Sequence, residues 1–256
     1  MKEFIYGRNP VYETLRANRR QATQLLLGEG VQITSRLDEI LELARQRKIP
    51  ISKVPRQRLD NINDSHQGLA LEVSEYPYAN LRDVLARADT HGESLFVLIL
   101  DSLQNPQNLG TLIRTAESVG VHGVVIANHR AAEITPAVVS ASAGASEYML
   151  VVQSNLAQAM SELKQMNAWV VGLDESPESL PLDQVRLDGA LAVVVGNEGD
   201  GMRALVRKQC DLLLRLPMQG RIASLNASVA GSVVLYLAYL ARHRDEPKIG
   251  NNTTSK

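Results

Sequence analysis

The sequence predicts an α/β protein of two domains, a small mixed unit followed by a larger one built on a parallel sheet. Its length of 256 residues suits one large domain or two modest ones. Hydrophobic residues make up 45% of the chain and charged residues 21%, so there is enough apolar surface for a core and the chain as a whole is not disordered. From residue 94 onward, short apolar runs alternate with helical patterns, which is typical of a parallel sheet covered by helices.

Residues 1–76 are predicted to form the small α/β domain. A helix is expected to open at Asn9, as its N-cap with Pro10 in the first turn, and to run to about Arg19. Ser35 is expected to cap a second helix, because apolar residues with helical spacing follow it. Short strands are predicted at 24–29, 51–54 and 69–73, and a short basic helix at 55–62.

Residues 77–93 are predicted to be a linker with one short helix, and residues 94–245 to form the larger domain. Strand patterns lie at 95–101, 123–127, 149–153, 169–174, 191–196 and 212–217, and helix patterns at 109–119, 135–144, 154–166, 201–209 and 224–241. The strand patterns are apolar almost throughout, as expected when helices cover both faces of a parallel sheet. The polar segment 246–256 is predicted to be a disordered tail.

Basic side chains are clustered in the first 76 residues, although the net charge of the whole chain is only −1. These residues hold 12 basic and 10 acidic side chains, so this part is slightly basic. One cluster consists of Arg8, Arg16, Arg19 and Arg20, and a second of Arg45, Arg47, Lys48, Lys53, Arg56 and Arg58. A surface that binds a nucleic-acid backbone would present such clusters, and a solvated basic face is the alternative interpretation.

Composition excludes several classes of protein. Apolar runs such as 95–100 are about six residues long, and no run approaches the roughly 18–20 residues of a transmembrane helix, so no membrane partner is expected. The single cysteine, Cys210, rules out an internal disulfide. Together with the lack of an apolar secretory segment at the N-terminus, it predicts a cytoplasmic protein. The five histidines show no metal-ligand spacing, so no metal is expected.

Three loops that follow predicted strands carry unusual residues, at 101–120, 196–202 and 216–236. Ligands of open α/β sheets bind outside the carboxyl ends of the strands, so these loops are the predicted site. The G-x-x-G-x-G spacing in the second loop differs from the G-x-G-x-x-G of dinucleotide-binding folds and follows a late strand, which argues against a nicotinamide-dependent dehydrogenase. No P-loop motif occurs. Taken singly, each glycine loop is equally well explained as a tight turn.

Arg114 is the unusual residue of the first loop. It is expected near the start of the helix at 109–119, where a positive charge opposes the helix dipole. A cation kept in such a place indicates a bound anion or a partner carboxylate. A salt bridge to Glu117 or Glu198 is the structural alternative.

Three motifs occur in order along the second domain. They are Asn105-Pro106-Gln107-Asn108-Leu109-Gly110 with Arg114, Gly196-Asn197-Glu198-Gly199-Asp200-Gly201, and Leu216-Pro217-Met218 with Ser224-Leu225-Asn226-Ala227-Ser228-Val229-Ala230. Together they closely resemble the motifs of the SpoU family of ribose 2′-O-methyltransferases, part of the SPOUT superfamily. The segments IYGRNPVYETL and HQGLALEV of the first domain are similar to the substrate-binding domain of RlmB-type 23S rRNA guanosine-2′-O-methyltransferases.

The resemblance implies a fold and a set of partners. The second domain would be a SPOUT domain, a parallel sheet with a trefoil knot at its C-terminal end, and the first domain would bind RNA. The knot loops would hold S-adenosylmethionine, the methyl donor, and no metal would be needed. The family also implies a homodimer that acts on large-subunit rRNA, with subunits paired through the region of the last helix.

The resemblance also assigns roles to residues. The polar residues expected around the target ribose, and therefore the catalytic candidates, are Asn108, Arg114, Glu198, Ser224 and Asn226. The cofactor is expected to contact Gly196, Leu216, Met218 and Leu225. Two of the polar residues have a structural alternative, in which Glu198 caps a helix that starts near Asp200 and Ser224 caps the last helix.

Other functions stay open at this point. A tRNA 2′-O-methyltransferase and an antibiotic-resistance rRNA methylase would share the chemistry, although tRNA enzymes of this family usually lack the first domain. A non-catalytic RNA-binding or ribosome-assembly factor is the alternative from a different class. It is disfavoured because every polar residue of the three motifs is present.

Overall fold

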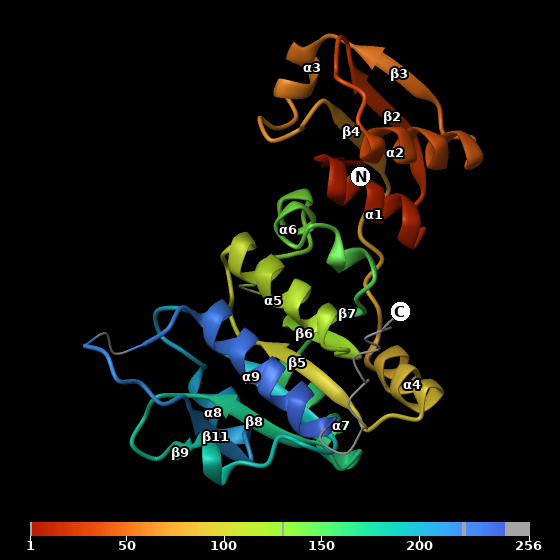
Figure 1. Cartoon of the computed structure of the whole chain (residues 1–256). Helices are drawn as coiled ribbons and strands as arrows, with labels where there is room; N and C mark the ends of the chain where they lie inside the picture. The colour runs from red at the N-terminus through yellow and green to blue at the C-terminus, as the bar shows by residue number, and fades with distance from the viewer. Residues whose placement is uncertain (1, 130, 222–223, 244–256) are drawn as a thin grey trace, which may run out of the picture.

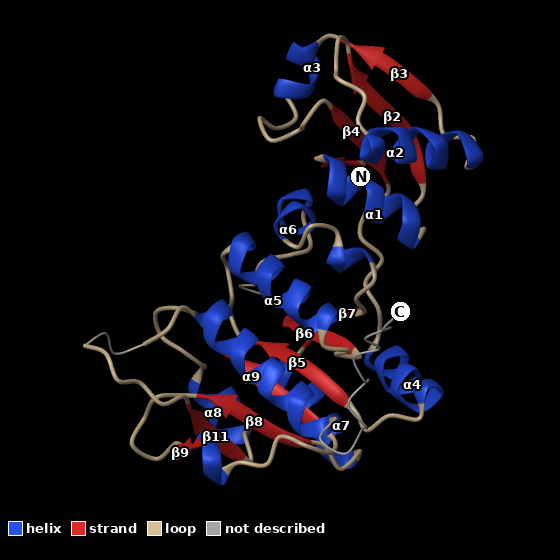
Figure 2. Ribbon diagram, viewed as in Figure 1, coloured by secondary structure: helices blue, strands red, loops and turns tan. Residues whose placement is uncertain are grey.

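The computed structural model describes residues 2–129, 131–221 and 224–243, and it contains two sheets, each with its own helices (Figure 1, Figure 2). The small N-terminal sheet lies at the top of both views and the large sheet below it. The predicted disordered tail at 246–256 falls outside the described residues. Within the described ranges, no helix combines the length and the apolar character that crossing a bilayer requires.

The small sheet has four strands in the order β1-β4-β2-β3. Its domain consists of β1 (Glu3–Tyr6), α1 (Arg8–Ala17), β2 (Ala22–Gly28), α2 (Ser35–Gln46), β3 (Ile51–Val54), α3 (Arg56–Asp60) and β4 (Leu69–Val73). Every element predicted for this part of the chain is present, and β3 and β4 have the predicted bounds. β1 is absent from the prediction, because a strand of four residues is too short to show a pattern and is defined by its antiparallel pairing with β4.

Two predicted N-caps are wrong. The N-cap of α1 is Gly7, whose φ of 88° suits glycine, and Asn9 lies inside the helix. The N-cap of α2 is Thr34, whose side chain accepts a hydrogen bond from Leu37 N, and Ser35 is the first helical residue. Backbone dihedral angles decide which of two neighbouring residues becomes the cap, and these angles depend on how the preceding strand or loop enters the helix.

The large sheet has seven strands in the order β7-β6-β5-β10-β8-β11-β9, and all of its strand pairs are parallel. The strands are β5 (Phe96–Leu100), β6 (Gly123–Ala127), β7 (Val151–Ser154), β8 (Trp169–Leu173), β9 (Leu180–Pro181), β10 (Leu191–Val195) and β11 (Leu212–Arg215). The predicted parallel sheet is confirmed, with β9 as an additional strand of two residues. The chain leaves β5 toward β7 at one edge and later continues on the other side of β5, so the strand order reverses between β5 and β10, where ligands usually bind.

Helices cover both faces of the large sheet (Figure 2). They are α4 (Leu81–His91), α5 (Pro106–Ser118), α6 (Pro136–Ala141), α7 (Leu156–Gln165), α8 (Ala204–Gln209) and α9 (Ala227–Arg242), with short 3₁₀ segments η1 (Ala145–Glu147) and η2 (Leu182–Gln184). Alternate residues of β5 mark the two faces. Phe96, Leu98 and Leu100 belong to the core under α5 and α9, whereas Val97 and Ile99 belong to the core under α4 and α7.

Candidate active site

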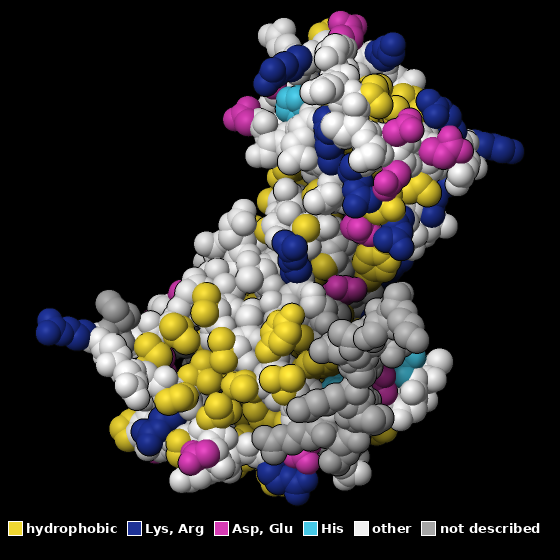
Figure 3. Space-filling view, viewed as in Figure 1, with side chains coloured by type: hydrophobic (Ala, Val, Ile, Leu, Met, Phe, Trp, Pro, Cys, Tyr) yellow, Lys and Arg dark blue, Asp and Glu magenta, His cyan; other side chains and the backbone are white. Residues whose placement is uncertain are grey.

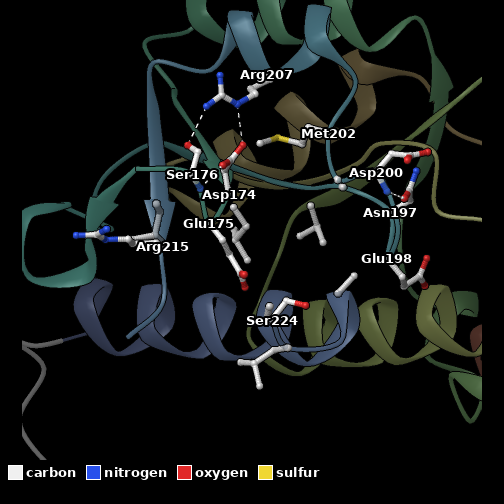
Figure 4. Close-up of a pocket in the computed structure, with 18 of the residues that line it drawn as sticks. Asp174, Glu175, Ser176, Asn197, Glu198, Asp200, Met202, Arg207, Arg215 and Ser224 are labelled. Atoms are coloured by element: carbon white, nitrogen blue, oxygen red, sulfur yellow. Dashed lines mark hydrogen bonds and ion pairs between the residues drawn. The ribbon is translucent and has the colours of Figure 1, made fainter. Parts of the chain in front are cut away.

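A cavity of about 700 Å³ opens at the carboxyl ends of β8, β10 and β11, between the second and third predicted loops and the segment that follows β8 (Figure 4). In Figure 4 the segment of Asp174 and Ser176 faces the loop of Asn197 and Asp200 across the cavity, and Ser224 lies below both. Five of the residues predicted for the site line this cavity. They are Gly196, Glu198, Leu216, Ser224 and Leu225.

The loop after β10 is a tight turn that has room for glycine alone at its first position. A Cβ on Gly196 would lie 2.3 Å from the backbone of Gly201, closer than side-chain atoms ever approach. Asn197 holds the turn closed, because its Oδ1 accepts hydrogen bonds of 2.8 Å from Gly199 N and from Asp200 N. The turn therefore presents mainly backbone to the cavity, as a loop that grips a small ligand would.

Four polar side chains meet beside this cavity and are called the amide cluster here: Asn108, Glu198, Asn226 and Ser228. Asn108 Nδ2 donates a hydrogen bond to Glu198 Oε1. Asn108 Oδ1 accepts from Asn226 Nδ2 at 3.3 Å and lies 3.1 Å from the Ser228 hydroxyl. All three sequence motifs thus contribute to a single cluster, the third with two residues. Asn108 and Ser228 are buried, and Glu198 and Asn226 are exposed.

The orientation of Asn226 is fixed by a structural role at the start of α9. Its Oδ1 accepts from Ser228 N at 2.9 Å and from Val229 N at 3.4 Å, so Asn226 is the N-cap of this helix. The Ser228 hydroxyl lies 2.6 Å from the same oxygen. The sequence motif predicts no role for Ser228, and its place two residues after Asn226 is the signal that points to this contact.

Two structural alternatives from the sequence are wrong. Ser224 does not cap the last helix, because Asn226 does, and Ser224 is exposed on the cavity wall. Glu198 does not cap the following helix either, because α8 begins at Ala204 with Arg203 as its N-cap. Neither side chain is needed to start a helix.

Arg114 does not take part in the hydrogen bonds of the amide cluster and does not line the cavity. α5 begins at Pro106 with Asn105 as its cap, so Arg114 lies in the second half of the helix, and the expected conflict with the helix dipole is wrong. The side chain is exposed, and its guanidinium has no hydrogen bond or ion pair with any residue the structure describes. The salt bridges considered for it, to Glu117 or Glu198, are not formed.

Met218 is the one predicted cofactor contact that does not line this cavity. It is 39% exposed and borders a neighbouring cavity of about 1360 Å³, which shares Leu216 and Arg215 with the first. Leu225, in contrast, lines the first cavity with 38% of its surface exposed. Whether an apolar residue of a loop faces one hollow or the next depends on the path of the loop, which the sequence motif does not contain.

Comparison with known proteins explains this arrangement. The model of the SpoU rRNA Methylase family matches residues 95–236, and the model for RNA 2′-O ribose methyltransferase substrate binding matches residues 4–79. The chain belongs to the SpoU family of RNA methyltransferases. A curated relative, the putative TrmH family tRNA/rRNA methyltransferase YacO of Bacillus subtilis, is 41% identical over 245 residues, which cover 94% of this chain and 96% of the relative.

Solved structures share the fold of this SpoU methyltransferase. The SpoU methyltransferase AviRb from Streptomyces viridochromogenes, in complex with AdoMet, superposes with a TM-score of 0.77 at 22% identity, covering 93% of this chain and 89% of its own. The A. aeolicus TrmH/SpoU tRNA modifying enzyme superposes with a TM-score of 0.53 at 26% identity and covers 59% of this chain and 76% of its own. The first match extends over both domains of the SpoU chain.

As a SpoU methyltransferase, the protein uses S-adenosylmethionine as its methyl donor. The cavity fits such a group in size, since pockets for small ligands typically measure about 300–1,000 Å³. The tight turn at Gly196 offers backbone polar groups, and Leu216 and Leu225 offer apolar surface against which a flat base can pack. The apolar surface suits the adenine, and the lining also includes carboxylates such as Asp174, Glu175 and Asp200, which suit the positive charge of the sulfonium.

A buried carboxylate that sequence reasoning did not select holds two of the loops of the SpoU site together. Asp101, at the end of β5, is fully buried and accepts hydrogen bonds from Arg203 N at 2.7 Å and from Arg203 Nε at 2.6 Å. The backbone adds a bond of 2.9 Å from Asp101 N to Val195 O. The segment that leads to Asn108 is therefore tied to the loop that carries Glu198. A charged residue at the end of an apolar strand was the signal for it.

A second carboxylate shapes the opposite rim of the cavity. Asp174 accepts from Arg207 Nε at 2.8 Å and from Ser176 N at 2.7 Å (Figure 4). Partial burial opposes ionisation, but the hydrogen bonds from Arg207 and Ser176 outweigh it and hold the pKa of Asp174 below its usual value. At neutral pH Asp174 is therefore ionised, and its ion pair with Arg207 closes this rim of the cavity.

One group of possible metal ligands occurs within the described ranges, and its geometry argues against a metal. The ligand atoms of His91, Glu93 and His122 lie within 4.8 Å of one another. His122 Nδ1 accepts a hydrogen bond of 2.9 Å from Phe96 N, which places the ring proton on Nε2, 3.0 Å from Glu93. A metal at Nε2 would have to displace that proton. The contact between His122 and Glu93 is therefore a structural hydrogen bond.

Proposed function

We propose that this SpoU methyltransferase methylates the 2′-oxygen of a guanosine ribose in 23S rRNA. The observation that carries the proposal is the double position of Glu198, which lines the cavity and also belongs to the amide cluster. A methyl donor in the cavity and a ribose at the cluster would thus be neighbours. Family membership supports RNA as the substrate, and the substrate-binding match over residues 4–79 supports an RNA-binding role for the first domain.

The proposed cofactor contacts follow the cavity wall. We place S-adenosylmethionine against Gly196, Leu216 and Leu225, with Met218 beyond Leu216 as a contact that stays a prediction. The trefoil knot also stays a prediction, supported by the family and by the structural likeness of the whole chain to AviRb.

The chemistry requires a ribose hydroxyl to be aligned and relieved of its proton. S-adenosylmethionine supplies an electrophilic methyl group when it is bound. Asn108 donates a hydrogen bond to Oε1 of Glu198 and so leaves Oε2 to accept the hydroxyl proton. Asn226, the N-cap of α9, keeps Asn108 in place through its own hydrogen bond. Alignment of the reacting oxygen contributes on the order of 7–11 kcal/mol in ideal cases. Ser224, exposed on the cavity wall, is proposed to bind the ribose or its phosphate.

Arg114 is proposed to bind an RNA phosphate near the target ribose. Its guanidinium is exposed and has no partner among the residues that the structure describes, so it is available to a ligand. A guanidinium stays charged in proteins, and it therefore acts here as a cation and not as the base. Its planar set of donors suits two oxygens of one phosphate.

A homodimer is the proposed assembly. Val229, Val233, Tyr236 and Leu240 repeat with helical spacing along α9 and are 40–58% exposed. Figure 3 shows apolar side chains gathered on the face of the large domain that α9 crosses. An apolar helix face of this kind is normally covered by a partner. Light scattering should give about twice the chain mass of 28.0 kDa, and a monomer at micromolar concentration would contradict the dimer.

Ribosomal RNA is favoured over tRNA by the first domain. Its second basic cluster follows the end of α2, the edge strand β3 and α3, and its members are exposed except for the half-buried Arg47. Figure 3 shows dark-blue basic side chains spread over this domain. The A. aeolicus tRNA modifying enzyme matches only 59% of the chain, whereas the rRNA methyltransferase from Sinorhizobium meliloti matches 96%. An RNA substrate and the single cysteine favour the cytoplasm as the location.

The deciding experiment is a map of ribose methylation in rRNA and tRNA from a strain that lacks this protein, with the wild-type chain restored as the control. Loss of one 2′-O-methylguanosine from 23S rRNA is expected. Loss of a methyl group from tRNA would establish the tRNA alternative instead. Calorimetric titration with S-adenosylmethionine and with NAD, in parallel, should show binding of the first ligand alone.

A further inference from the structure

Two arginines that the sequence assigns to a basic surface cluster are removed from the surface by the fold. Arg19 and Arg20 lie between α1 and β2, where the small domain meets the segment from α6 to β7 (Figure 1). Arg20 is only 4% exposed, and Arg19 is half-buried. Neither is free to bind RNA. Arg8 is also half-buried and donates hydrogen bonds to Gln67, Thr34 and Gln32, so Arg16 is the one exposed arginine of the predicted first cluster.

Arg19 reaches across to backbone carbonyls outside the small sheet. It donates hydrogen bonds to the carbonyl oxygen of Met149 at 2.6 Å, of Glu147 at 3.3 Å and of Pro77 at 3.0 Å. The Tyr76 hydroxyl lies 2.8 Å from the carbonyl oxygens of Ser146 and Met149. Burial raises the pKa of Tyr76 to about 12, so this hydroxyl keeps its proton and acts as a donor.

Arg20 forms a buried ion pair across the same boundary. Its guanidinium lies 2.6 Å from Glu3 and 3.2 Å from Glu147, and the side chains of Arg20 and Glu147 are both fully buried. Neither carboxylate oxygen of Glu147 has a hydrogen-bond donor among the described residues, so Arg20 supplies its nearest positive charge. Arg20 also has Glu3 of its own domain as a partner, whereas the buried Glu147 has its cation only when the small domain is docked in this position.

The surroundings leave little freedom for a hinge. Tyr148 donates a hydrogen bond of 2.7 Å to Glu13 of α1. A Cβ on Gly144, whose φ is +92°, would lie 2.5 Å from Glu13, so the backbone of the large domain passes directly against α1. Ile5 and Val11 of the small domain belong to the same apolar core as Val138 of the large one.

We propose that Arg19, Arg20, Tyr76 and Glu147, together called the joint, hold the small domain at one fixed position on the methyltransferase domain and thereby determine which nucleotide of a bound RNA reaches the cavity. The inference rests on the proposed function for its RNA part. The joint residues are positioning residues, since they touch neither cavity nor ribose. A rigid joint sets the distance between an RNA anchored on the small domain and the amide cluster, as a fixed ruler would.

The test uses full-length Arg20→Met, Glu147→Leu and the double variant. In Arg20→Met the Glu147 carboxylate is left buried without its cation, and we expect the domains to separate roughly a hundredfold more often than in wild type. Hydrogen–deuterium exchange of peptides covering residues 144–150 measures this opening. The double variant removes both charges and should return exchange close to the wild-type rate.

Acidification supplies a second signature. Burial raises the pKa of Glu147, while Arg20 and Arg19 oppose the shift. Loss of Arg20 removes part of that opposition and raises this pKa further. A group whose pKa is higher in the docked state favours docking at low pH, because protonation removes the buried charge. The protection factor, which compares the observed exchange rate with the intrinsic rate at the same pH, should therefore rise in Arg20→Met as pH falls, and this rise should be absent when Glu147→Leu is also present.

Methylation mapping gives the functional readout. Wild type should modify one ribose, Arg20→Met should lose yield there and modify neighbouring riboses, and the double variant should recover the single site. Arg186→Met is the matched control, because Arg186 is an exposed arginine paired with Asp188 on the surface of the large domain.

Tyr76→Phe leaves no buried charge and is the alternative variant if Arg20→Met does not fold. It should increase opening roughly tenfold in the same direction.

Two results would overturn the proposal. Unchanged exchange in both Arg20→Met and Tyr76→Phe would show that the joint does not hold the domains. Faster exchange with an unchanged methylation site would show that the joint does not select the nucleotide. If wild type methylates no RNA, the proposed function fails and nucleotide selection fails with it, while the exchange data still decide whether the joint exists.

Discussion

The joint under the small domain and the amide cluster beside the cavity each hold one glutamate next to a nitrogen group from another element. Glu147 of the joint is fully buried and faces the charged guanidinium of Arg20. Glu198 of the amide cluster is exposed and accepts from the neutral amide of Asn108. A buried ion pair fixes the relative position of two domains, whereas a carboxylate bound by an amide at the surface keeps its second oxygen available to a ligand.

The largest expected effect is a loss of turnover on substitution of Glu198, the glutamate that is proposed to act in the reaction. Glu198→Gln keeps an acceptor for Asn108 and removes the proton acceptor, so single-turnover methylation should fall roughly 10²–10⁴-fold. Because Glu198 is exposed, the free energy of unfolding should change by no more than in ordinary surface substitutions, about 0.5 kcal/mol. Glu162→Gln on α7, bonded to Gln158, is the control. Normal turnover in Glu198→Gln would remove this carboxylate from the reaction.

Arg114→Lys tests whether an unpartnered cation belongs to the chemistry. The substitution keeps the charge and removes the planar set of donors, and we expect turnover to fall about 10²-fold. Affinity for S-adenosylmethionine and thermal stability should hardly change, since the guanidinium contacts neither the cavity nor a described side chain. Single-turnover kinetics beside a cofactor titration distinguishes the cases. Lost cofactor binding would reassign Arg114 to the methyl-donor pocket.

Asp101→Asn tests a buried carboxylate that, like Glu147 of the joint, is paired with an arginine from another segment. The buried carboxylate accepts two hydrogen bonds from Arg203, and the amide cannot accept both equally well. Bonds to charged groups contribute about 1.5–3 kcal/mol, so the free energy of unfolding should fall by about 2 kcal/mol. Denaturant titration measures the loss. A variant that lost turnover at unchanged stability would contradict the assignment of Asp101 as a tie between loops.

The smallest expected effect concerns His122, which is buried like Glu147 and paired with an exposed glutamate. Burial lowers the pKa of His122 below its ordinary value of 6.5, although the hydrogen bond to Glu93 partly opposes the shift. A group whose folded pKa is lowered contributes stability above its unfolded pKa and loses it as pH falls through the folded value. Unfolding between pH 7 and 5 should show wild type losing stability faster than His122→Gln. Parallel curves would contradict this.

Much of the fold was determined by local sequence. Continuous apolar runs such as those of β5, β6 and β10 are compatible only with strands covered on both faces, and the parallel sheet followed from them. The three motif loops were also placed correctly at the carboxyl ends of strands, because alternation of strand and helix forces every such loop to one edge of the sheet. Elements of two to four residues, such as β9 and β1, carry no pattern and exist only through their partners.

For the site, the sequence determined which residue types were present and tertiary structure decided which of them meet. Asn108, Glu198 and Asn226 were predicted from separate motifs and do lie together, yet Arg114 and Met218 face other surroundings. The two arginines after α1 had the sequence character of an RNA-binding surface and became part of the joint. Charge and polarity are properties of a residue, whereas burial and partners arise from segments far apart in the chain, so a linear pattern specifies the first and leaves the second to the fold.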